Sequence, residues 1–213
     1  MSDYRVVDIE QLDTDLSIVA DAVRTKIGTT ESMAFPNGFV NALPDFKGML
    51  DATIKEVVVP HNVTKLRRGS FYDCGQLEKI TFHDGVTAVD SACFFGCSKL
   101  LEVAFPAGVQ TIGSQTFFTC SVLQKVDCWL IALIGSSNFQ YCYKLGTLII
   151  RSGNVCALAS TSAFSNTPIG DGRGYIYVPR ALVDSYKSAT NWSTYANQFR
   201  AIEDYPEICG GAT

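Results

Sequence analysis

Cysteine is the most reactive residue type that this sequence uses often, with 8 cysteines among 213 residues. Thiolates can act as nucleophiles, pair as disulfides or bind zinc. Four of the cysteines recur at spacings of 23, 23 and 22 residues: Cys74, Cys97, Cys120 and Cys142. A zinc site needs closely paired ligands, but the sequence has no CxxC pair and only 2 histidines. The even spacing therefore indicates one equivalent position in successive repeats rather than a single metal or redox centre.

The start of the sequence determines the expected state of these thiols. Residues 1–15 are polar and acidic, without the basic and apolar regions of a secretory signal, so we expect synthesis in the cytoplasm without a signal peptide. A reducing cytosol keeps cysteines as thiols, and a buried thiol packs as a small hydrophobic side chain. We therefore expect buried thiols, with disulfides and a metal site as the alternatives.

No set of residues in the sequence indicates catalysis, so we expect a protein that is not an enzyme and needs no cofactor. His61 and His83 are the two histidines, and His83 occupies the position that Pro60 and Pro106 hold in the neighbouring repeats. The sequence contains no GxSxG, HExxH, Walker or GxGxxG motif. His83 is interpreted as a turn residue, and a catalytic base is the alternative.

The cysteine column belongs to a repeat in which every cysteine has the same neighbours. A phenylalanine stands three residues before it, a leucine three residues after it, and an aliphatic residue three residues further on opens a strand-like run. The phenylalanines are Phe71, Phe94, Phe117 and Phe139, the leucines Leu77, Leu100, Leu123 and Leu145, and the aliphatic residues Ile80, Val103, Val126 and Leu148. A fixed period of about 20–50 residues predicts a solenoid, in which each repeat is one coil stacked on the last.

Each coil is predicted to open with a short strand whose alternate residues face inward, as Val57 and Val59 do in the first coil. Successive strands should pair in parallel, about 4.8 Å apart. A second β-branched stretch follows in each coil, and a tight turn or single helical turn then carries the phenylalanine and the cysteine. In this register, one row of alternating charge runs across the strands: Glu56, Lys79, Glu102 and Lys125.

Three regions are predicted along the chain. They are an N-terminal helical docking segment (residues 1–46), a solenoid of five coils (residues 54–174) and a C-terminal strand-plus-helix cap (residues 175–213). In the cap we expect a strand over 175–178, a helix over 180–189, and a second short helix that carries Trp192, Tyr195 and Phe199. Residues 209–213 are expected to be disordered. The cap should cover the open end of the stack, because a bare sheet end aggregates.

Charge and hydropathy argue against two classes of partner. The net charge is −4, the sequence pI is about 5.1, and no basic run exceeds Arg67-Arg68, so no nucleic-acid-binding surface is expected. The longest apolar run, over residues 128–134, is far too short for a membrane span, and we expect no membrane insertion.

The repeat resembles the BspA-type leucine-rich repeats found in gut bacteria, their phages and some protists. The resemblance covers residues 54 to about 178, and Gly113–Cys120 is close to the family consensus. The fourth coil departs from the pattern at Trp129–Ile134, where the usual proline and polar turn are missing. The resemblance implies a leucine-rich-repeat-like solenoid of mainly short parallel β-strands with tight or single-turn helical connections.

Two flanking segments are similar to proteins of phages and prophages of Firmicutes. Leu16–Gly28 followed by Phe35–Phe39 resembles an N-terminal segment of tail-associated proteins, and Tyr177–Trp192 resembles a C-terminal segment often joined to such repeats. This implies a virion or tail-tip component that recognises a protein or cell-surface glycan of a bacterial host. The N-terminal segment would contact other virion proteins. The alternative is a BspA-type adhesin at the cell surface or another protein-interaction scaffold. A hydrolase is a third hypothesis, but the sequence has no set of catalytic residues for it.

One candidate binding surface is a stripe of aromatic residues. Tyr72, Phe95 and Phe118 each follow a core phenylalanine, so they should lie along one edge of the solenoid. Exposed aromatic patches often mark interfaces. The alternative is that these rings are half-buried against the turn of the next coil.

A second candidate lies at the ends of two strands in the irregular region. Trp129 and Arg151 stand at equivalent positions beside outward-facing Asp127, and together they could stack on a sugar or bind a partner. The alternative is that Trp129 fills space within the irregular fourth coil.

Overall fold

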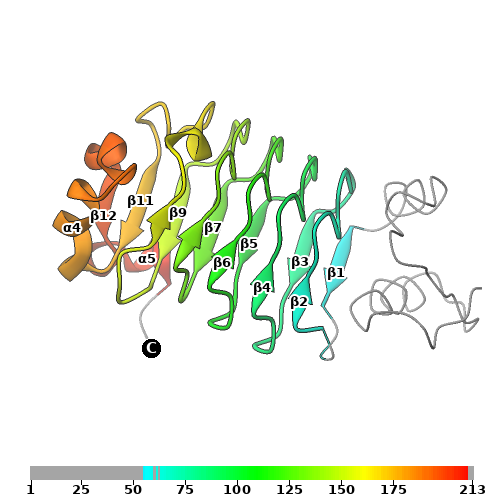
Figure 1. The fold of residues 1–213 in the computed structure, drawn as a ribbon. Coiled ribbons are helices and arrows are strands. Elements are labelled where there is room, and N and C mark those ends of the chain that lie inside the picture. The colour runs from blue at the N-terminus through cyan, green and yellow to red at the C-terminus, as the bar shows by residue number, and fades with distance from the viewer. Residues whose placement is uncertain (1–54, 60, 62, 211–213) are drawn as a thin grey trace, which may run out of the picture.

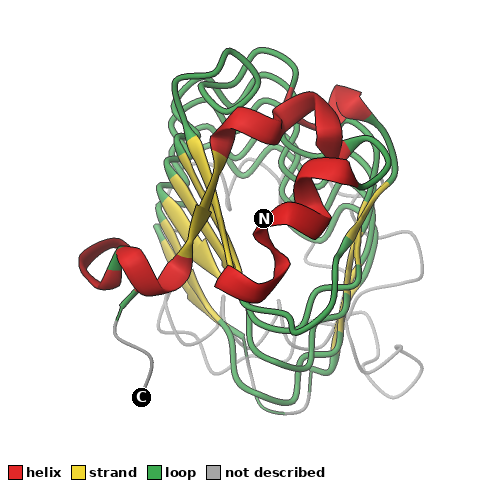
Figure 2. Ribbon diagram, turned by 90° about the vertical axis from the view of Figure 1, so that its left-hand side faces the viewer, coloured by secondary structure: helices red, strands yellow, loops and turns green. Residues whose placement is uncertain are grey.

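A computed structural model describes residues 55–59, 61 and 63–210 of the chain, whose strands form two parallel sheets facing each other across the core (Figures 1 and 2). The long sheet contains, in order, β1 (Glu56–Val58), β3 (Lys79–Thr81), β5 (Glu102–Ala104), β7 (Lys125–Cys128), β9 (Thr147–Ile150), β11 (Tyr175–Val178) and β12 (Phe199–Ala201). The short sheet contains β2 (Lys65–Leu66), β4 (Ala88–Val89), β6 (Thr111–Ile112), β8 (Leu133–Ile134) and β10 (Ala157–Leu158). The predicted solenoid of short parallel strands is confirmed, and the predicted docking segment, residues 1–46, lies outside the described residues.

The predicted register of the long sheet is also confirmed. Glu56 pairs with Lys79, Lys79 with Glu102, and Glu102 with Lys125, so the row of alternating charge is present. In the long sheet, β1, β3 and β5 each have a buried residue between two exposed ones. Because a slip of one residue would turn every inward side chain outward, this alternation fixes the register.

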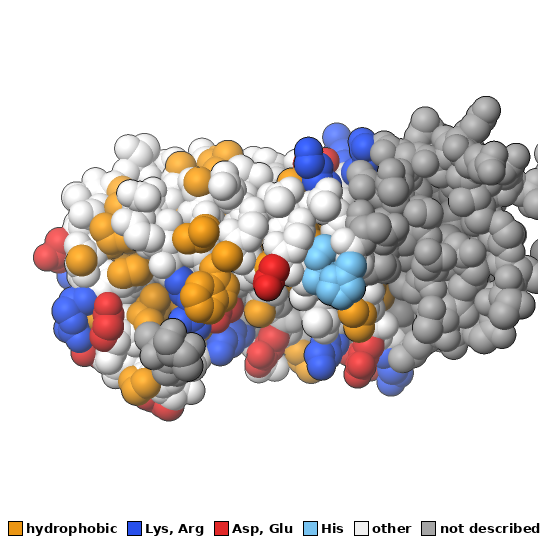
Figure 3. All heavy atoms as spheres, turned by 90° about the horizontal axis from the view of Figure 1, so that it is seen from below, with side chains coloured by type: hydrophobic (Ala, Val, Ile, Leu, Met, Phe, Trp, Pro, Cys, Tyr) orange, Lys and Arg blue, Asp and Glu red, His pale blue; other side chains and the backbone are white. Residues whose placement is uncertain are grey.

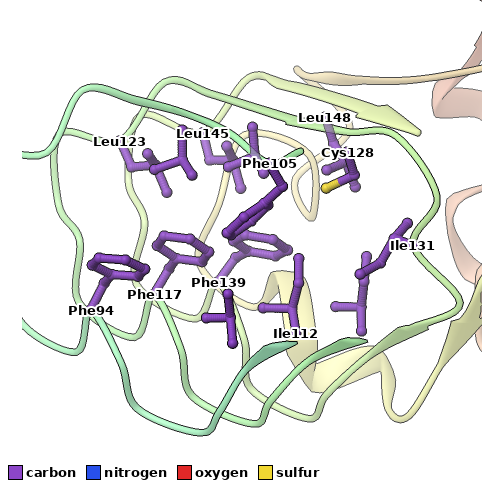
Figure 4. Packing of buried hydrophobic residues seen from close by; sticks show 14 of the residues in the cluster. Phe94, Phe105, Ile112, Phe117, Leu123, Cys128, Ile131, Phe139, Leu145 and Leu148 are labelled. Atoms are coloured by element: carbon purple, nitrogen blue, oxygen red, sulfur yellow. The ribbon is translucent and has the colours of Figure 1, made fainter. Parts of the chain in front are cut away.

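The core between the sheets is built on a stack of phenylalanine rings. Consecutive ring centroids lie 5.3, 5.3, 5.5 and 5.4 Å apart with nearly parallel planes, for the series Phe71, Phe94, Phe117, Phe139 and Phe164. Figure 4 shows three of these rings side by side, with leucines of the next column beside them. Offset stacking of this kind adds about 0.5–1.5 kcal/mol per pair to the burial of the rings.

The cysteine column links successive coils through hydrogen bonds. The Sγ of Cys97 donates to the carbonyl of Phe71 at 3.1 Å, and Cys120 and Cys142 repeat this contact to Phe94 and Phe117 at 3.0 and 2.9 Å. All eight cysteines are buried free thiols. Burial raises the pKa of Cys93 and Cys156 to about 12 and that of Cys120 well above its ordinary value. The expected role as packing residues is confirmed, and the thiols of Cys97, Cys120 and Cys142 each also donate to a carbonyl of the preceding coil.

The C-terminal region closes the end of the stack. It contains the 3-10 helix η3 (Arg180–Leu182), the α-helix α4 (Val183–Ser188), and the 3-10 helix η4 (Trp192–Gln198). Figure 2 shows these helices crossing the end between the two sheets. No helix in the described part of the chain has the length and apolarity needed to cross a bilayer.

Side chains of this region form hydrogen bonds with the backbone N–H and C=O groups at the edge of the last coil, where a further coil would otherwise pair. The hydroxyl of Tyr186 accepts from the amide of Cys156 at 2.9 Å, and the indole N–H of Trp192 donates to the carbonyl of the same residue. Asn191 donates to the carbonyl of Leu158 at 2.7 Å. Buried polar backbone groups left unpaired are costly, so these side chains take the place of the missing coil.

Two expectations for the C-terminus are wrong. Phe199 lies in strand β12, not in a helix, because residues 199–201 pair in parallel with Ile176–Val178 and extend the long sheet. Cys209 is not disordered: it ends the short helix α5 (Pro206–Cys209) and is buried against the outside of the long sheet. Residues 211–213 lie outside the described residues.

The thiols of the main core should resist labelling in the folded protein. A raised pKa lowers the thiolate fraction at about pH 8, and burial blocks access. We expect dithionitrobenzoate to react with the seven core cysteines only after global unfolding in denaturant, as followed by absorbance and mass spectrometry. Rapid reaction of Cys97, Cys120 or Cys142 in the native protein would contradict the buried column.

Replacement of Tyr186 by Phe tests the cap. The change leaves the ring in place but removes the hydroxyl that accepts from the buried amide of Cys156, which should cost about 1–3 kcal/mol of unfolding free energy. The measurement is denaturant unfolding followed by circular dichroism. Tyr175→Phe is the control, since the Tyr175 side chain is exposed, and an equal cost in both variants would contradict the capping role.

Candidate binding surface

The aromatic stripe exists as a stack of rings along one edge of the solenoid. The rings of Tyr72 and Phe95 lie 4.6 Å apart at 7°, and those of Phe95 and Phe118 lie 4.9 Å apart at 11°. Tyr141 then contacts Phe118 edge-on at 5.2 Å, and Tyr143 continues the row at 6.2 Å. The repeat pattern did not predict these two tyrosines, because Gln140 occupies the expected position. The signal for Tyr141 in the sequence is an aromatic residue one position later.

This geometry limits what the aromatic stripe can bind. Stacking on a sugar or a peptide plane needs a free ring face, but Phe95 lies between two other rings and presents mainly its edges. Phe95 and Phe118 are half-buried, while Tyr72 is 37% exposed. The stripe therefore has the contacts expected of the half-buried alternative, in which each ring packs on the next coil.

The second candidate group forms one connected cluster. The guanidinium of Arg151 donates to both carboxylate oxygens of Asp127, at 2.9 Å from Nε and 2.8 Å from Nη2. It also lies over the ring of Trp129, 5.0 Å from the centroid. The bidentate ion pair is largely shielded, with side-chain exposures of 14% and 15%, and its hydrogen bond raises the pKa of Arg151. We call Asp127, Trp129 and Arg151 the Trp129 cluster.

An unequal turn length places Trp129 at the surface. In the third coil three residues separate Phe105 from the next buried residue, Val109, whereas in the fourth coil only two separate Cys128 from Ile131. Ile131 fills the interior, so Trp129 does not; the indole is 49% exposed and Leu130 beside it is 50% exposed. The shorter turn also accounts for the 22-residue step in the cysteine column.

The Trp129 cluster adjoins an open hollow on the outward face of the long sheet. The hollow has a volume of about 630 Å³ and crosses β3, β5 and β7. Its floor includes the outward residues Thr81 and Ala104, and Asp127 belongs to both the hollow and the cluster. The charge row Glu56, Lys79, Glu102 and Lys125 lines it as well. The hollow and the cluster therefore form one continuous surface of mixed charge.

The two histidines lie in adjacent turns, on the edge of the solenoid that follows the long-sheet strands. They are the pale blue pair in Figure 3, and exposed hydrophobic side chains gather on the same face. The Nδ1 of His83 accepts from the amide of Gly85 at 3.1 Å, and its Nε2 contacts the carbonyl of Val63 at 2.9 Å. These contacts occupy both ring nitrogens, Nδ1 within the turn of His83 itself and Nε2 with the preceding coil, which is an arrangement expected of a turn residue. Among the described residues, no three His, Cys, Asp or Glu side chains converge as metal ligands.

The fold is that of a leucine-rich-repeat solenoid, and the sequence comparison identifies the family. Residues 46–169 match the model of the BspA type leucine rich repeat region, in 6 copies. This match covers more than half of the chain, and the chain therefore belongs to the BspA-type leucine-rich repeat family. No curated protein matches it.

Three solved structures that are similar to the chain have leucine-rich repeats. One from T. pallidum has a TM-score of 0.50 and 21% identity, over 59% of this chain and 58% of that one. A leucine-rich repeat protein from Bacteroides ovatus has a TM-score of 0.34 and 23% identity, over 61% and 40%. A leucine rich cell surface protein from Faecalibacterium prausnitzii has a TM-score of 0.28 and 16% identity, over 62% and 56%. The chain thus spans less than two thirds of each, and the likeness to the first supports the fold alone.

Alanine substitutions should separate the surface role of Trp129 from a structural one. Because the indole is half exposed, Trp129→Ala should cost less than about 2 kcal/mol of unfolding free energy, whereas Phe117→Ala in the core should cost about 3–5 kcal/mol. Denaturant unfolding of both variants gives the comparison. A loss at Trp129 equal to that at Phe117 would show that the indole holds the fourth coil together.

Proposed function

We propose that the chain is a non-enzymatic binding module that contacts a macromolecular partner through the Trp129 cluster and the adjoining hollow. The observation that carries this proposal is an exposed tryptophan held in place by a shielded, bidentate Asp127–Arg151 pair. Tryptophan and arginine are enriched among the residues that dominate binding energy. A side chain that is already ordered before binding also loses less entropy in the complex.

The setting we propose is the tail of a phage or prophage, where the module recognises the host surface or neighbouring virion subunits. Support for this setting comes from the similarity of Leu16–Gly28, Phe35–Phe39 and Tyr177–Trp192 to segments of tail-associated proteins. The partner would be a protein or cell-surface glycan of the host, and the N-terminal segment would attach to other virion proteins. Membership of the BspA-type family supports a second setting, a bacterial surface adhesin or another protein-interaction scaffold.

Binding to intact bacterial cells tests the role of the Trp129 cluster. The fluorescently labelled full chain is titrated onto cells of the producing species and its relatives, and Trp129→Ala should weaken binding by at least about tenfold. Tyr143→Ala is the matched control, because it removes an aromatic ring that is even more exposed, at 57%. Equal binding by wild type and Trp129→Ala, or equal loss in both variants, would contradict the proposed surface.

Immunogold labelling distinguishes the two settings. Particles released after prophage induction should carry the chain at the tail if the first setting holds. Label confined to the surface of uninduced cells would instead support the adhesin, and label on neither would reject both.

A further inference from the structure

The residues that follow β12 turn back over the outside of the long sheet, away from the main core. They form the 3-10 helix η5 (Ile202–Asp204) and then α5, and we call Ile202–Cys209 the C-terminal segment. Figures 1 and 2 show α5 on the outer side of the sheet, on the opposite side from α4 and η4. The segment thus lies on the same outward face as the open hollow.

Apolar contacts of the C-terminal segment form a small cluster of their own. Cys209 is buried together with Ile149 and Tyr177, the outward residues of β9 and β11, and Ile202, Tyr205 and Ile208 pack against them. The rings of Tyr177 and Tyr205 meet edge-on at 5.4 Å. This cluster is separate from the core between the sheets, so it adds an external layer to the solenoid.

Cationic side chains of the sheet bind the end of the segment through its backbone. The Nζ of Lys125 donates to the carbonyl of Ile208 at 2.8 Å, and Nη2 of Arg151 donates to the carbonyl of Cys209. At the other end, the backbone amide of Arg180 donates to the Glu203 carboxylate at 3.1 Å. Carbonyls at the C-terminal end of a helix carry partial negative charge, which favours these cations. Such contacts recognise a polypeptide backbone with little dependence on its side chains.

The covered and open parts of the outward face belong to one column of the sheet. By the strand register, Asp127 lies beside Ala104 on one side and beside Ile149 on the other, and Ile149 pairs with Tyr177. Ile149 and Tyr177 lie under the C-terminal segment, while Ala104 lines the open hollow. Lys125 and Arg151 stand at this boundary, and Arg151 belongs to the Trp129 cluster.

We propose that the outward face of the long sheet is a polypeptide-binding track and that the C-terminal segment is its resident occupant. The partner is a short polypeptide segment that displaces the C-terminal segment. Its apolar side chains pack against Ile149 and Tyr177, and its backbone carbonyls accept hydrogen bonds from Lys125 and Arg151. Displacement should leave the solenoid closed, because Tyr186 of α4, Trp192 of η4 and Phe199 of β12 pack in the main core and β12 pairs with β11. This inference rests on the proposed function, for which it names a polypeptide rather than a glycan as the partner.

Thiol labelling of the full chain tests whether the segment can leave the sheet. Cys209 is the one cysteine in the external cluster, and the other seven lie in the main core. In the double variant Tyr205→Ala with Ile208→Ala, Cys209 should react with dithionitrobenzoate at least about tenfold faster than in wild type, while the core thiols stay protected. Lys125→Ala should act in the same direction, and Lys187→Ala, which changes an exposed side chain of α4 away from the segment, should have no effect.

A peptide added in trans tests the track itself. The probe is a fluorescein-labelled peptide of residues 201–210 with alanine in place of Cys209, measured by anisotropy against the full-length double variant. Binding at least about tenfold tighter than that of a peptide that also lacks the Tyr205 and Ile208 side chains would support the track. Equal binding of the two peptides, or no binding of either, would overturn the proposed track. A double variant that fails to fold, or that exposes all eight thiols together, would overturn it as well. None of these outcomes depends on binding to host cells, so the two proposals can fail separately.

Discussion

The structure depends on the need of every coil to present its backbone and its core side chains to an equivalent coil about 5 Å away. In the first three coils each long-sheet strand buries only one face, so a coil of this kind does not enclose a core by itself. Stacking resolves this by pairing the strands in parallel and by placing phenylalanine on phenylalanine. The thiol column adds internal hydrogen bonds, from the Sγ of Cys97, Cys120 and Cys142 to a carbonyl of the preceding coil. Cysteine suits this position because it is small, apolar and still a weak donor.

The same constraint organises the surface and creates a problem at the ends. A residue type repeated at an outward position becomes a row, as with the alternating charges and the stacked aromatic stripe. At the C-terminal end no coil follows, and Tyr186, Asn191 and Trp192 supply the donors and the acceptor that a further coil would have supplied. A terminal unit must therefore differ in sequence from the repeats, as it does here.

The repeated part of the fold was predictable from the sequence, because the period shows which residues of successive coils lie side by side. The columns of Phe, Cys and Leu identify the inward residues, and their spacing alone places Glu56 beside Lys79, as the strand register has it. The misses lie where no repeat exists. Phe199 has helical spacing relative to Trp192 and Tyr195, but the free edge of β11 offered backbone pairing that local pattern does not reveal. Cys209 is buried through contacts with residues 60 and 32 positions earlier, Ile149 and Tyr177, which no short-range signal could show.

The candidate binding surface arises where the repeat is broken, and this follows from the same constraint. In a regular coil nearly every side chain has a fixed role in the column, so the coil has little freedom to vary. The fourth coil loses one turn residue, which moves Trp129 and Leu130 outward, and the fifth coil supplies Arg151 to hold the indole and Asp127. Local departures from an otherwise consistent pattern are where function is expected. The C-terminal segment ends at the same arginine, so the irregular turns, the hollow and the external cluster meet at one residue. Arg151 thus connects the surface that is open to a partner with the surface that the chain itself already covers.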